Sequence, residues 1–410
     1  MLSKKTIAIV KSTAPILQEN GETLTRHFYR RMFSNNPEVI PLFNHANQVS
    51  GLQQRALAGA IYAYAANIDN LGALAGAVEL IAQKHASLQI KPEHYPIVGE
   101  NLLASIKEVL GDGATDDIIN AWAEAYGFLA DILIGREGQI YAQNESIPGG
   151  WSGFKNFRVI RKEKESSVIT SFYLIPADGT AVPGFKPGQY ITVRVPDSSG
   201  RTTMRNYSLS DKPGQPHFRI SVKREVGVDA DTPEGYTSNV LHRNINVGNS
   251  IEVGPPCGEF FLDPNEKHSR PLVLIAAGVG VTPIYSILHS ALEVASDRQV
   301  VFIHAVLNED VQPFKAIFDA LAEKHNNLTV RYRYSEPAKS GVLRQGNAST
   351  GSVDTTFIES LIPSHDADYF FCGPKPFMVR IYHGLLAWGI PTSQVHFEFF
   401  GPRQELEKVT

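Results

Sequence analysis

The sequence predicts a multidomain protein: an all-α domain, then an antiparallel β-barrel, then a parallel α/β domain. Helical periodicity runs through residues 1–145, and a stretch rich in helix breakers, Ser146–Gly153, separates it from short strand-like runs. Beyond Pro271, strand-like runs alternate with helical stretches, which is typical of a parallel sheet. A chain of 410 residues is long enough to form several separate cores.

Composition narrows the class of protein. A net charge of -4 over the whole chain creates no basic field for nucleic acid or anionic lipid. The two cysteines, Cys257 and Cys372, are too few for a disulfide framework and suit a reducing compartment. Lys11 interrupts the apolar run Ile7–Val10, and Pro271–Ile284 is shorter than the roughly 18 residues of a membrane span. We expect a cytoplasmic monomer with no nucleic-acid partner and no integral membrane segment.

The all-α domain shows both helix periodicity and helix breaks. Apolar residues recur at spacings of three and four from Ala56 to Tyr64, as an amphipathic helix requires. A long helix is predicted over 115–141, with Asp116 and Asp117 in its first turn, where carboxylates suit the helix dipole. Breaks between helices are predicted at Gly21, Pro37, Asn70–Gly72, Pro92 and Gly111–Gly113.

The strand-like runs divide the rest of the chain. Those before residue 264 are separated by Gly and Pro turns, which predicts the small barrel, and they include Phe157–Ile160, Ile169–Ile175 and Tyr190–Val195. The parallel sheet is predicted from Leu272–Ala277, Val300–Ala305, Thr329–Tyr334 and Tyr369–Cys372. We place the domains at 1–146, 154–264 and 270–410, with a linker at 147–153.

His85 is the candidate metal ligand of the helical domain. An ordinary structural or exposed role is the usual interpretation for a lone helical histidine, and the chain has 13 histidines. On a separate helix, the spacing of Gln53 and Leu57 puts both on one face. Two such helices could hold a planar cofactor between His85 on one side and these two residues on the other.

The order of several residues carries a family resemblance. Phe28-Tyr29, Pro37, Phe43, Gln53, Leu57, Lys84-His85 and Tyr95 occur in the order of the globin domain of bacterial flavohaemoglobins, which this half resembles. The resemblance implies one haem b, with His85 as proximal iron ligand and Phe43 and Leu57 in the haem pocket. It also implies that Tyr29 and Gln53 face bound oxygen, where a phenol and an amide can donate hydrogen bonds to its partial negative charge.

The same resemblance implies a proximal hydrogen-bonding pair, Tyr95 and Glu137. A carboxylate beside the second imidazole nitrogen makes the iron ligand more electron-donating, which favours oxygen activation over storage. Taken alone, Glu137 would be interpreted as a solvated charge at a helix end. The family often has a further acidic residue where this chain has Gln139.

Arg205-Asn206-Tyr207-Ser208 is a weak motif alone, since an arginine and a tyrosine on a strand are often a surface pair. With Pro187–Tyr190 before it and Gly235–Asn239 after it, it resembles the FAD-binding barrel of the ferredoxin-NADP reductase superfamily. The resemblance implies that the arginine neutralises the flavin pyrophosphate and that backbone N–H groups at Gly235–Ser238 cradle phosphate. Tyr207 and Ser208 would contact the isoalloxazine. The implied FAD-binding residues are Tyr190, Arg205, Asn206, Tyr207, Ser208, Gly235, Tyr236, Thr237, Ser238, Phe399, Phe400, Gly401 and Pro402.

The strand Leu272–Ala277, the turn after it and the following helix form a phosphate-binding pattern in which Pro283 replaces the third glycine of the common fingerprint. Together with Tyr369–Met378 it resembles the nicotinamide site of the same superfamily; otherwise Cys372 is an ordinary buried thiol. Residues 303–308 contain no arginine for a 2′-phosphate, which favours NADH over NADPH without deciding between them. The implied NAD(P)-binding residues are Ala277, Gly278, Val279, Gly280, Val281, Thr282, Cys372, Gly373 and Pro374.

The C-terminal run Val395–Pro402 resembles the family's closing segment over the flavin. By that resemblance, Lys84 and Glu398 lie near the junction of haem and flavin and tune both potentials. Otherwise this run is an aromatic strand end that finishes the sheet.

The resemblance implies a nitric oxide dioxygenase. NAD(P)H would reduce FAD, FAD would reduce the haem iron one electron at a time, and iron-bound oxygen would convert nitric oxide to nitrate. Two alternatives stay open: a haem-dependent alkyl or lipid hydroperoxide reductase, and an oxygen sensor or store.

Overall fold

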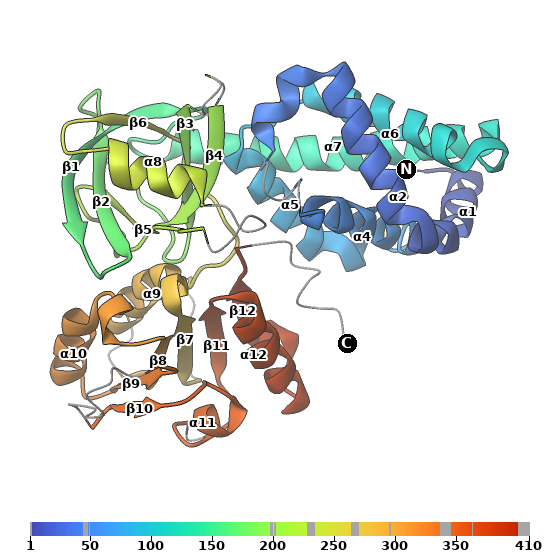
Figure 1. Ribbon diagram of the computed structural model, residues 1–410. Coiled ribbons are helices and arrows are strands. Elements are labelled where there is room, and N and C mark those ends of the chain that lie inside the picture. Colours follow the sequence, from blue (N-terminus) through green and yellow to red (C-terminus); the bar gives the residue numbers. More distant parts are fainter. Residues whose placement is uncertain are drawn as a thin grey trace. The chain divides into compact units, whose positions relative to one another are not determined.

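The computed structural model describes residues 2–43, 48, 50–196, 200, 202–227, 234–263, 270–294, 297–336, 346–362 and 364–400. Helices make up the N-terminal part, and two six-stranded sheets follow (Figure 1). This order confirms the predicted fold class. The chain forms two compact units: residues 1–146, 151–154 and 194–205 make the first, and residues 147–150, 155–193 and 206–410 make the second.

The helical domain buries an apolar core that includes Leu24, Phe28, Met32 and Trp122. Helix α2 packs against α4 and α6, and α7 packs against α1, α5 and α6. Its helices are α1 Lys4–Ser12, α2 Ala14–Asn35, η1 Pro37–Leu42, α4 Leu52–Ala66, η2 Leu71–Leu74, α5 Ala75–Ser87, α6 His94–Leu110, η3 Gly111–Gly113 and α7 Asp116–Ser146.

The predicted break at Gly21 is wrong, because α2 continues through this residue. A Cβ atom at Gly21 would lie 3.1 Å from the Cβ of Ala58 on α4. The glycine therefore allows the two helices to approach closely, and the stabilisation from their packing outweighs the low helix propensity of glycine. The predicted breaks near Pro37, Asn70, Pro92 and Gly111 all fall between α-helices, and short 3-10 turns occupy three of them.

Helix α7 is longer than predicted, with 31 residues. By length and composition alone α7 could cross a membrane, and in the described part of the chain no other helix meets this test. The core helix of a soluble protein meets it as well. Its buried residues include Trp122, Ala125 and the charged Glu137, which places part of α7 in the domain core.

The first sheet has the strand order β4-β3-β6-β1-β2-β5, and β1 pairs antiparallel with β2 and β6. Phe157 of β1 and Phe218 of β5 are fully buried and stack with their ring centroids 5.6 Å apart. Helix α8, Tyr236–Asn244, precedes the last strand. The strands are β1 Lys155–Lys164, β2 Ile169–Pro176, β3 Tyr190–Pro196, β4 Thr202–Ser208, β5 Phe218–Lys223 and β6 Ser250–Val253.

The second sheet is parallel in every pair and has the order β10-β9-β8-β7-β11-β12. From β7 the chain continues to β8 on one side and later returns to β11 on the other, so the strand order reverses at β7. Such a switch point is where open α/β sheets bind ligands, at the carboxyl ends of the strands. The strands are β7 Leu272–Ala277, β8 Val300–Val306, β9 Leu328–Tyr334, β10 Ala348–Thr350, β11 Asp368–Cys372 and β12 Val395–Glu398.

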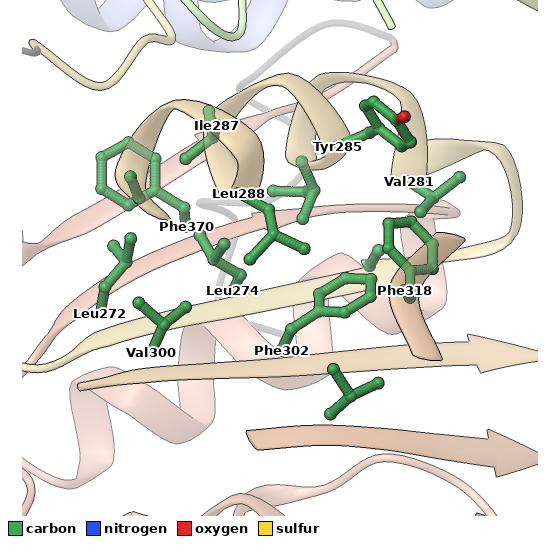
Figure 2. Close-up of a cluster of buried hydrophobic side chains, with 14 of the residues drawn as sticks. Leu272, Leu274, Val281, Tyr285, Ile287, Leu288, Val300, Phe302, Phe318 and Phe370 are labelled. Carbon is green, nitrogen blue, oxygen red and sulfur yellow. The ribbon is translucent and has the colours of Figure 1, made fainter. Parts of the chain in front are cut away.

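Helices cover both faces of this sheet. Ile287 and Leu288 of α9, Val281–Val294, pack toward Leu272, Leu274 and Phe302 on one face (Figure 2). Met378, Ile381 and Leu385 of α12, Lys375–Ala387, belong to the buried cluster on the other face. The remaining helical segments are η4 Gly278–Gly280, η5 Glu309–Val311, α10 Lys315–Lys324, α11 Thr355–Glu359 and η6 Thr392–Gln394.

Candidate functional site

His85, Tyr95 and Glu137 meet in the helical domain from α5, α6 and α7. The His85 Nδ1 atom lies 2.8 Å from Glu137 Oε1 and 3.1 Å from the Tyr95 hydroxyl, which itself donates to Glu137 Oε1 at 2.5 Å. Glu137 is only 2% exposed and lies inside α7, not at its end. The buried carboxylate oxygen is an acceptor for an Nδ1 proton, so the His85 Nε2 lone pair is the one available to a metal.

The surroundings of Tyr95 keep its phenol protonated. Burial, together with the Glu137 carboxylate, raises the pKa of Tyr95 well above its ordinary value, so the phenol is a neutral donor. Gln139, where the family often has an acid, is part of a neighbouring contact: its Oε1 accepts from Arg136, which also pairs with Glu79. Glu137 therefore provides the carboxylate that contacts His85.

Tyr29 of α2 is buried, at 6% exposure, in the same domain. Burial raises its pKa well above the ordinary value, and a hydrogen bond with Gln53 of α4 opposes that rise. Its ring contacts Phe43 edge-on at 5.7 Å and Phe33 at 5.8 Å. Phe33 was not singled out from the sequence, although its four-residue spacing from Tyr29 places both on one face. Leu57 packs on the same core.

Strand β4 carries the segment Arg205–Ser208. Ser208 Oγ and Asn206 Nδ2 are buried and have no hydrogen-bond partner among the described residues, and neither has Thr237 Oγ1 in α8. Buried polar atoms are almost always paired, so these atoms fit a polar ligand. The Arg205 guanidinium is half-buried and donates to the Met204 carbonyl at 2.6 Å.

Helix α8 begins with Tyr236, Thr237 and Ser238, directly after Gly235. A Cβ atom at Gly235 would lie 2.9 Å from the Cβ of Glu225, so only glycine fits there without a shift. At the other end of the helix, Lys162 Nζ donates to the His242 and Ile245 carbonyls, each at 2.8 Å. A cation at the C-terminus complements the helix dipole and leaves the N-terminus for an anion. The sequence offered no signal for Lys162, which belongs to a distant strand.

The remaining residues predicted to bind FAD differ in burial and in the part of the fold that they belong to. Tyr190 is 6% exposed and its ring lies against Gly258, where a Cβ atom would be 3.0 Å away. Phe399 packs on the nicotinamide-domain core, while Phe400 is exposed. Tyr207 is half-buried on β4. Gly401 and Pro402 lie outside the described residues.

Lys84 and Glu398 belong to different compact units, Lys84 beside His85 in α5 and Glu398 at the end of β12. Their proposed joint effect on the two potentials stays a prediction.

Two turns meet at the switch point of the parallel sheet. A Cβ atom at Gly280 would lie 2.2 Å from the Cys372 carbonyl oxygen, and one at Gly373 would lie 2.8 Å from the Ala277 Cβ. Gly278 has a φ of +54° and open space beside it, which suits the approach of a ligand. The turn leads directly into α9, at whose start Val281 and Thr282 lie, so a pyrophosphate can approach a helix N-terminus.

Neighbouring groups support this turn. The fully buried His304 of β8 donates from Nε2 to the Gly278 carbonyl at 3.3 Å, and burial lowers its pKa to about 4, so the ring is neutral. Thr282 Oγ1 donates to the Val279 carbonyl at 3.0 Å. Burial raises the pKa of Cys372 well above its ordinary value, which keeps the thiol protonated. Pro374 caps the start of α12. His304 was not among the residues expected at this site.

Comparison with known proteins decides the family. Models of the globin family, the oxidoreductase FAD-binding domain and the oxidoreductase NAD-binding domain match residues 26–133, 156–262 and 274–383. The Rhodopirellula baltica protein named flavohemoprotein is 51% identical over 409 residues, covering 100% of both chains. The chain belongs to the flavohaemoglobin family. A flavohemoprotein of Halalkalibacterium halodurans is 47% identical and covers 98% of this flavohaemoglobin and 97% of its own length.

Solved structures agree with this assignment. The flavohemoglobin of Malassezia yamatoensis, with bound FAD and haem, has a TM-score of 0.83 and 29% identity, covering 98% of this chain and 100% of its own. The flavohem-like FAD/NAD-binding domain of nitric oxide dioxygenase from Vibrio cholerae has a TM-score of 0.54 and 34% identity, covering 60% of this chain and 99% of its own. This flavohaemoglobin therefore uses haem, FAD and a nicotinamide nucleotide as electron donor. The three family matches lie within the predicted domains, whose boundaries stay a prediction.

The residues present fit all three groups. The available Nε2 of His85 suits the haem iron, and the unpaired buried atoms of Asn206, Ser208 and Thr237 suit FAD. The close contact of the two turns at Gly280 suits a dinucleotide at the switch point. The role of each residue toward its group stays a prediction.

Proposed function

We propose that this oxidoreductase is a nitric oxide dioxygenase. One NAD(P)H, two nitric oxide and two dioxygen molecules would yield two nitrates, NAD(P)+ and one proton. The observation that carries the proposal is the hydrogen-bonded group of His85, Tyr95 and Glu137 in a chain that also contains its own reductase domains. When bound, haem supplies the iron for oxygen chemistry and FAD divides a two-electron hydride into single electrons.

On the proximal side, Glu137 holds the His85 ring through Nδ1 and increases its electron donation. Tyr95 donates to the same carboxylate oxygen, which fixes the position of that oxygen. A carboxylate on the proximal histidine favours oxygen activation, which a simple oxygen store does not need. This contact supports an enzyme over a sensor or store.

On the distal side, Tyr29 and Gln53 provide polar hydrogens in an otherwise aromatic environment. The raised pKa of Tyr29 keeps its phenol protonated at any physiological pH. The two residues share a hydrogen bond across α2 and α4, which orients the phenol. We propose that the pair donates to dioxygen in the pocket and holds it for reaction with nitric oxide.

We further propose that the protein works in the cytoplasm as a monomer. The two buried cysteines are free, which suits a reducing compartment.

The test measures nitric oxide consumption, nitrate yield and NAD(P)H oxidation with the haem- and FAD-loaded protein. We expect nitrate to form only with oxygen, at two nitric oxide molecules for each NAD(P)H. The same preparation is then assayed with alkyl hydroperoxides in place of nitric oxide. Nitric oxide loss without oxygen-dependent nitrate, a ratio far from two, or faster turnover of hydroperoxides would contradict the proposal.

A further inference from the structure

Arg219 of β5 lies between the antiparallel sheet and the parallel α/β domain. Its side chain is 4% exposed. Its guanidinium carbon lies 4.3 Å from the ring centroid of Tyr285 and 4.9 Å from that of Phe314, both of which belong to the α/β domain. On its own side, Arg219 donates to the Ser210 carbonyl. One buried cation therefore joins the two domains.

Polar partners from both domains accompany the buried charge: it has hydrogen bonds with the side chains of Tyr173 and Tyr285, and Asp211 lies nearby. The Arg219 Nε atom is 3.9 Å from Asp211 Oδ2 and has no hydrogen-bond partner among the described residues. Removing a guanidinium from water costs free energy, and aromatic faces return only part of it. A well-packed apolar residue at this position would stabilise the protein equally well. The buried arginine therefore indicates a role in positioning the two domains relative to each other.

Phe314 adds strain at the same place. Its φ of +61° is in the left-handed region, which is unfavourable for a bulky residue. The side chain is 4% exposed, and its ring contacts Tyr285 at 5.0 Å. Strain of this kind persists only where the surroundings hold it, and it often accompanies a functional constraint.

The contact leads directly to the nicotinamide site. Tyr285 follows Gly280 by five residues and lies near the N-terminal end of α9, where it also packs toward Phe318 (Figure 2). Strand β5 contacts the turn Gly278–Gly280 as well. Arg219 thus contacts the first part of the helix that would bind the nucleotide, and the strand that carries Arg219 contacts the turn before that helix.

We propose that Arg219 is a positioning residue for hydride transfer from NAD(P)H to FAD. It fixes α9 against the flavin-binding sheet, and so sets the distance and angle between nicotinamide and isoalloxazine. Hydride transfer requires reacting atoms about 3–3.5 Å apart, and a displacement of about 1 Å can cost roughly 100-fold in rate. The inference rests on FAD reduction by the nucleotide and does not require that nitric oxide be the substrate.

The experiment uses the full-length protein loaded with haem and FAD, without oxygen or nitric oxide. Flavin reduction by NADH is followed by stopped flow in wild type and Arg219→Met, with NADH and with NADH deuterated at the transferred position. We expect the limiting rate to fall about 10- to 100-fold. The nucleotide dissociation constant should change less than about threefold, and the deuterium isotope effect should increase or reach its full value.

Lys212→Met is the matched control. Lys212 also forms an ion pair with the α/β domain, through Glu293, but both side chains are substantially exposed. Exposed pairs contribute little, so its flavin-reduction rate should stay within about twofold of wild type. Arg219→Lys keeps the charge without the planar guanidinium, and should recover part of the lost rate.

Tyr285→Leu tests the same contact from the other domain, in case Arg219→Met does not fold or bind FAD. It should reproduce the lower limiting rate with nearly unchanged nucleotide affinity. Either of two results overturns the proposal: a limiting rate within about twofold of wild type in FAD-loaded Tyr285→Leu, or a large loss of nucleotide affinity with an unchanged limiting rate.

Discussion

Replacing Glu137 with glutamine should raise the haem reduction potential. The substitution keeps the size of a side chain that is 2% exposed, and removes the charge that lies 2.8 Å from His85 Nδ1. A hydrogen bond to a charged group contributes about 1.5–3 kcal/mol and a neutral one about 0.5–1.5 kcal/mol. The loss at His85 is therefore about 1–1.5 kcal/mol.

Only the part of this free energy by which the carboxylate favours the ferric over the ferrous form changes the potential. About 1.4 kcal/mol corresponds to roughly 60 mV for a one-electron couple, which is therefore the upper limit of the shift. Because a more electron-donating ligand stabilises the ferric form, Glu137→Gln should raise the potential, by at most about 60 mV. The flavin potential of the same protein should not change, which makes it an internal reference.

The assay is an anaerobic spectroelectrochemical titration that follows the haem and flavin bands together. Glu79→Gln is the control, since Glu79 is a partly buried carboxylate in the same domain that pairs with Arg136. It should leave the haem potential unchanged. A haem potential in Glu137→Gln equal to wild type, with haem content intact, would refute the electronic role of the carboxylate.

Three further predictions concern the reductase domains. Arg205→Ala should lose FAD, measured by flavin content, while chemically reduced haem still binds oxygen; a parallel loss of oxygen binding would contradict the division of labour. Gly280→Ala places a Cβ atom 2.2 Å from the Cys372 carbonyl oxygen and should abolish flavin reduction by NADH, whereas Gly76→Ala, with open space around it, should not. The pKa of His304 is lowered to about 4 from its ordinary 6.5, so the unfolded chain binds more protons between these values and stability should fall as pH falls through this window. Chemical denaturation of wild type and His304→Gln from pH 7 to 4 should show a flatter profile in the variant.

Local sequence patterns were enough to predict the kinds of domain and their order along the chain. Helical periodicity, Gly and Pro breaks and short β-rich runs depend on neighbouring residues only, so they predicted three kinds of domain in the observed order. Motif order also pointed to residues that the structure brings together, such as His85, Tyr95 and Glu137. For Glu137, the resemblance to a family was needed, because its immediate neighbours suggest an exposed charge.

Other features depended on approaches between residues far apart in the chain. From its sequence neighbours alone, Gly21 is predicted to break a helix. In the structure Ala58 lies so close to it that the glycine allows two helices to pack together. Lys162 caps a helix about 80 residues later in the chain, and nothing around it in the sequence indicates that role.

The sequence by itself determined the kinds of domain and their order, because these depend on short-range patterns, while the cofactor motifs were indicated by a resemblance to a known family. Only the tertiary structure decided which groups are buried and paired. It buried Glu137 against His85, left Asn206 and Ser208 with unpaired polar atoms, and enclosed Arg219 between two domains. The reason is physical. Desolvation and close packing depend on residues that are far apart in the sequence, and the sequence alone does not give the distances between them in the folded chain.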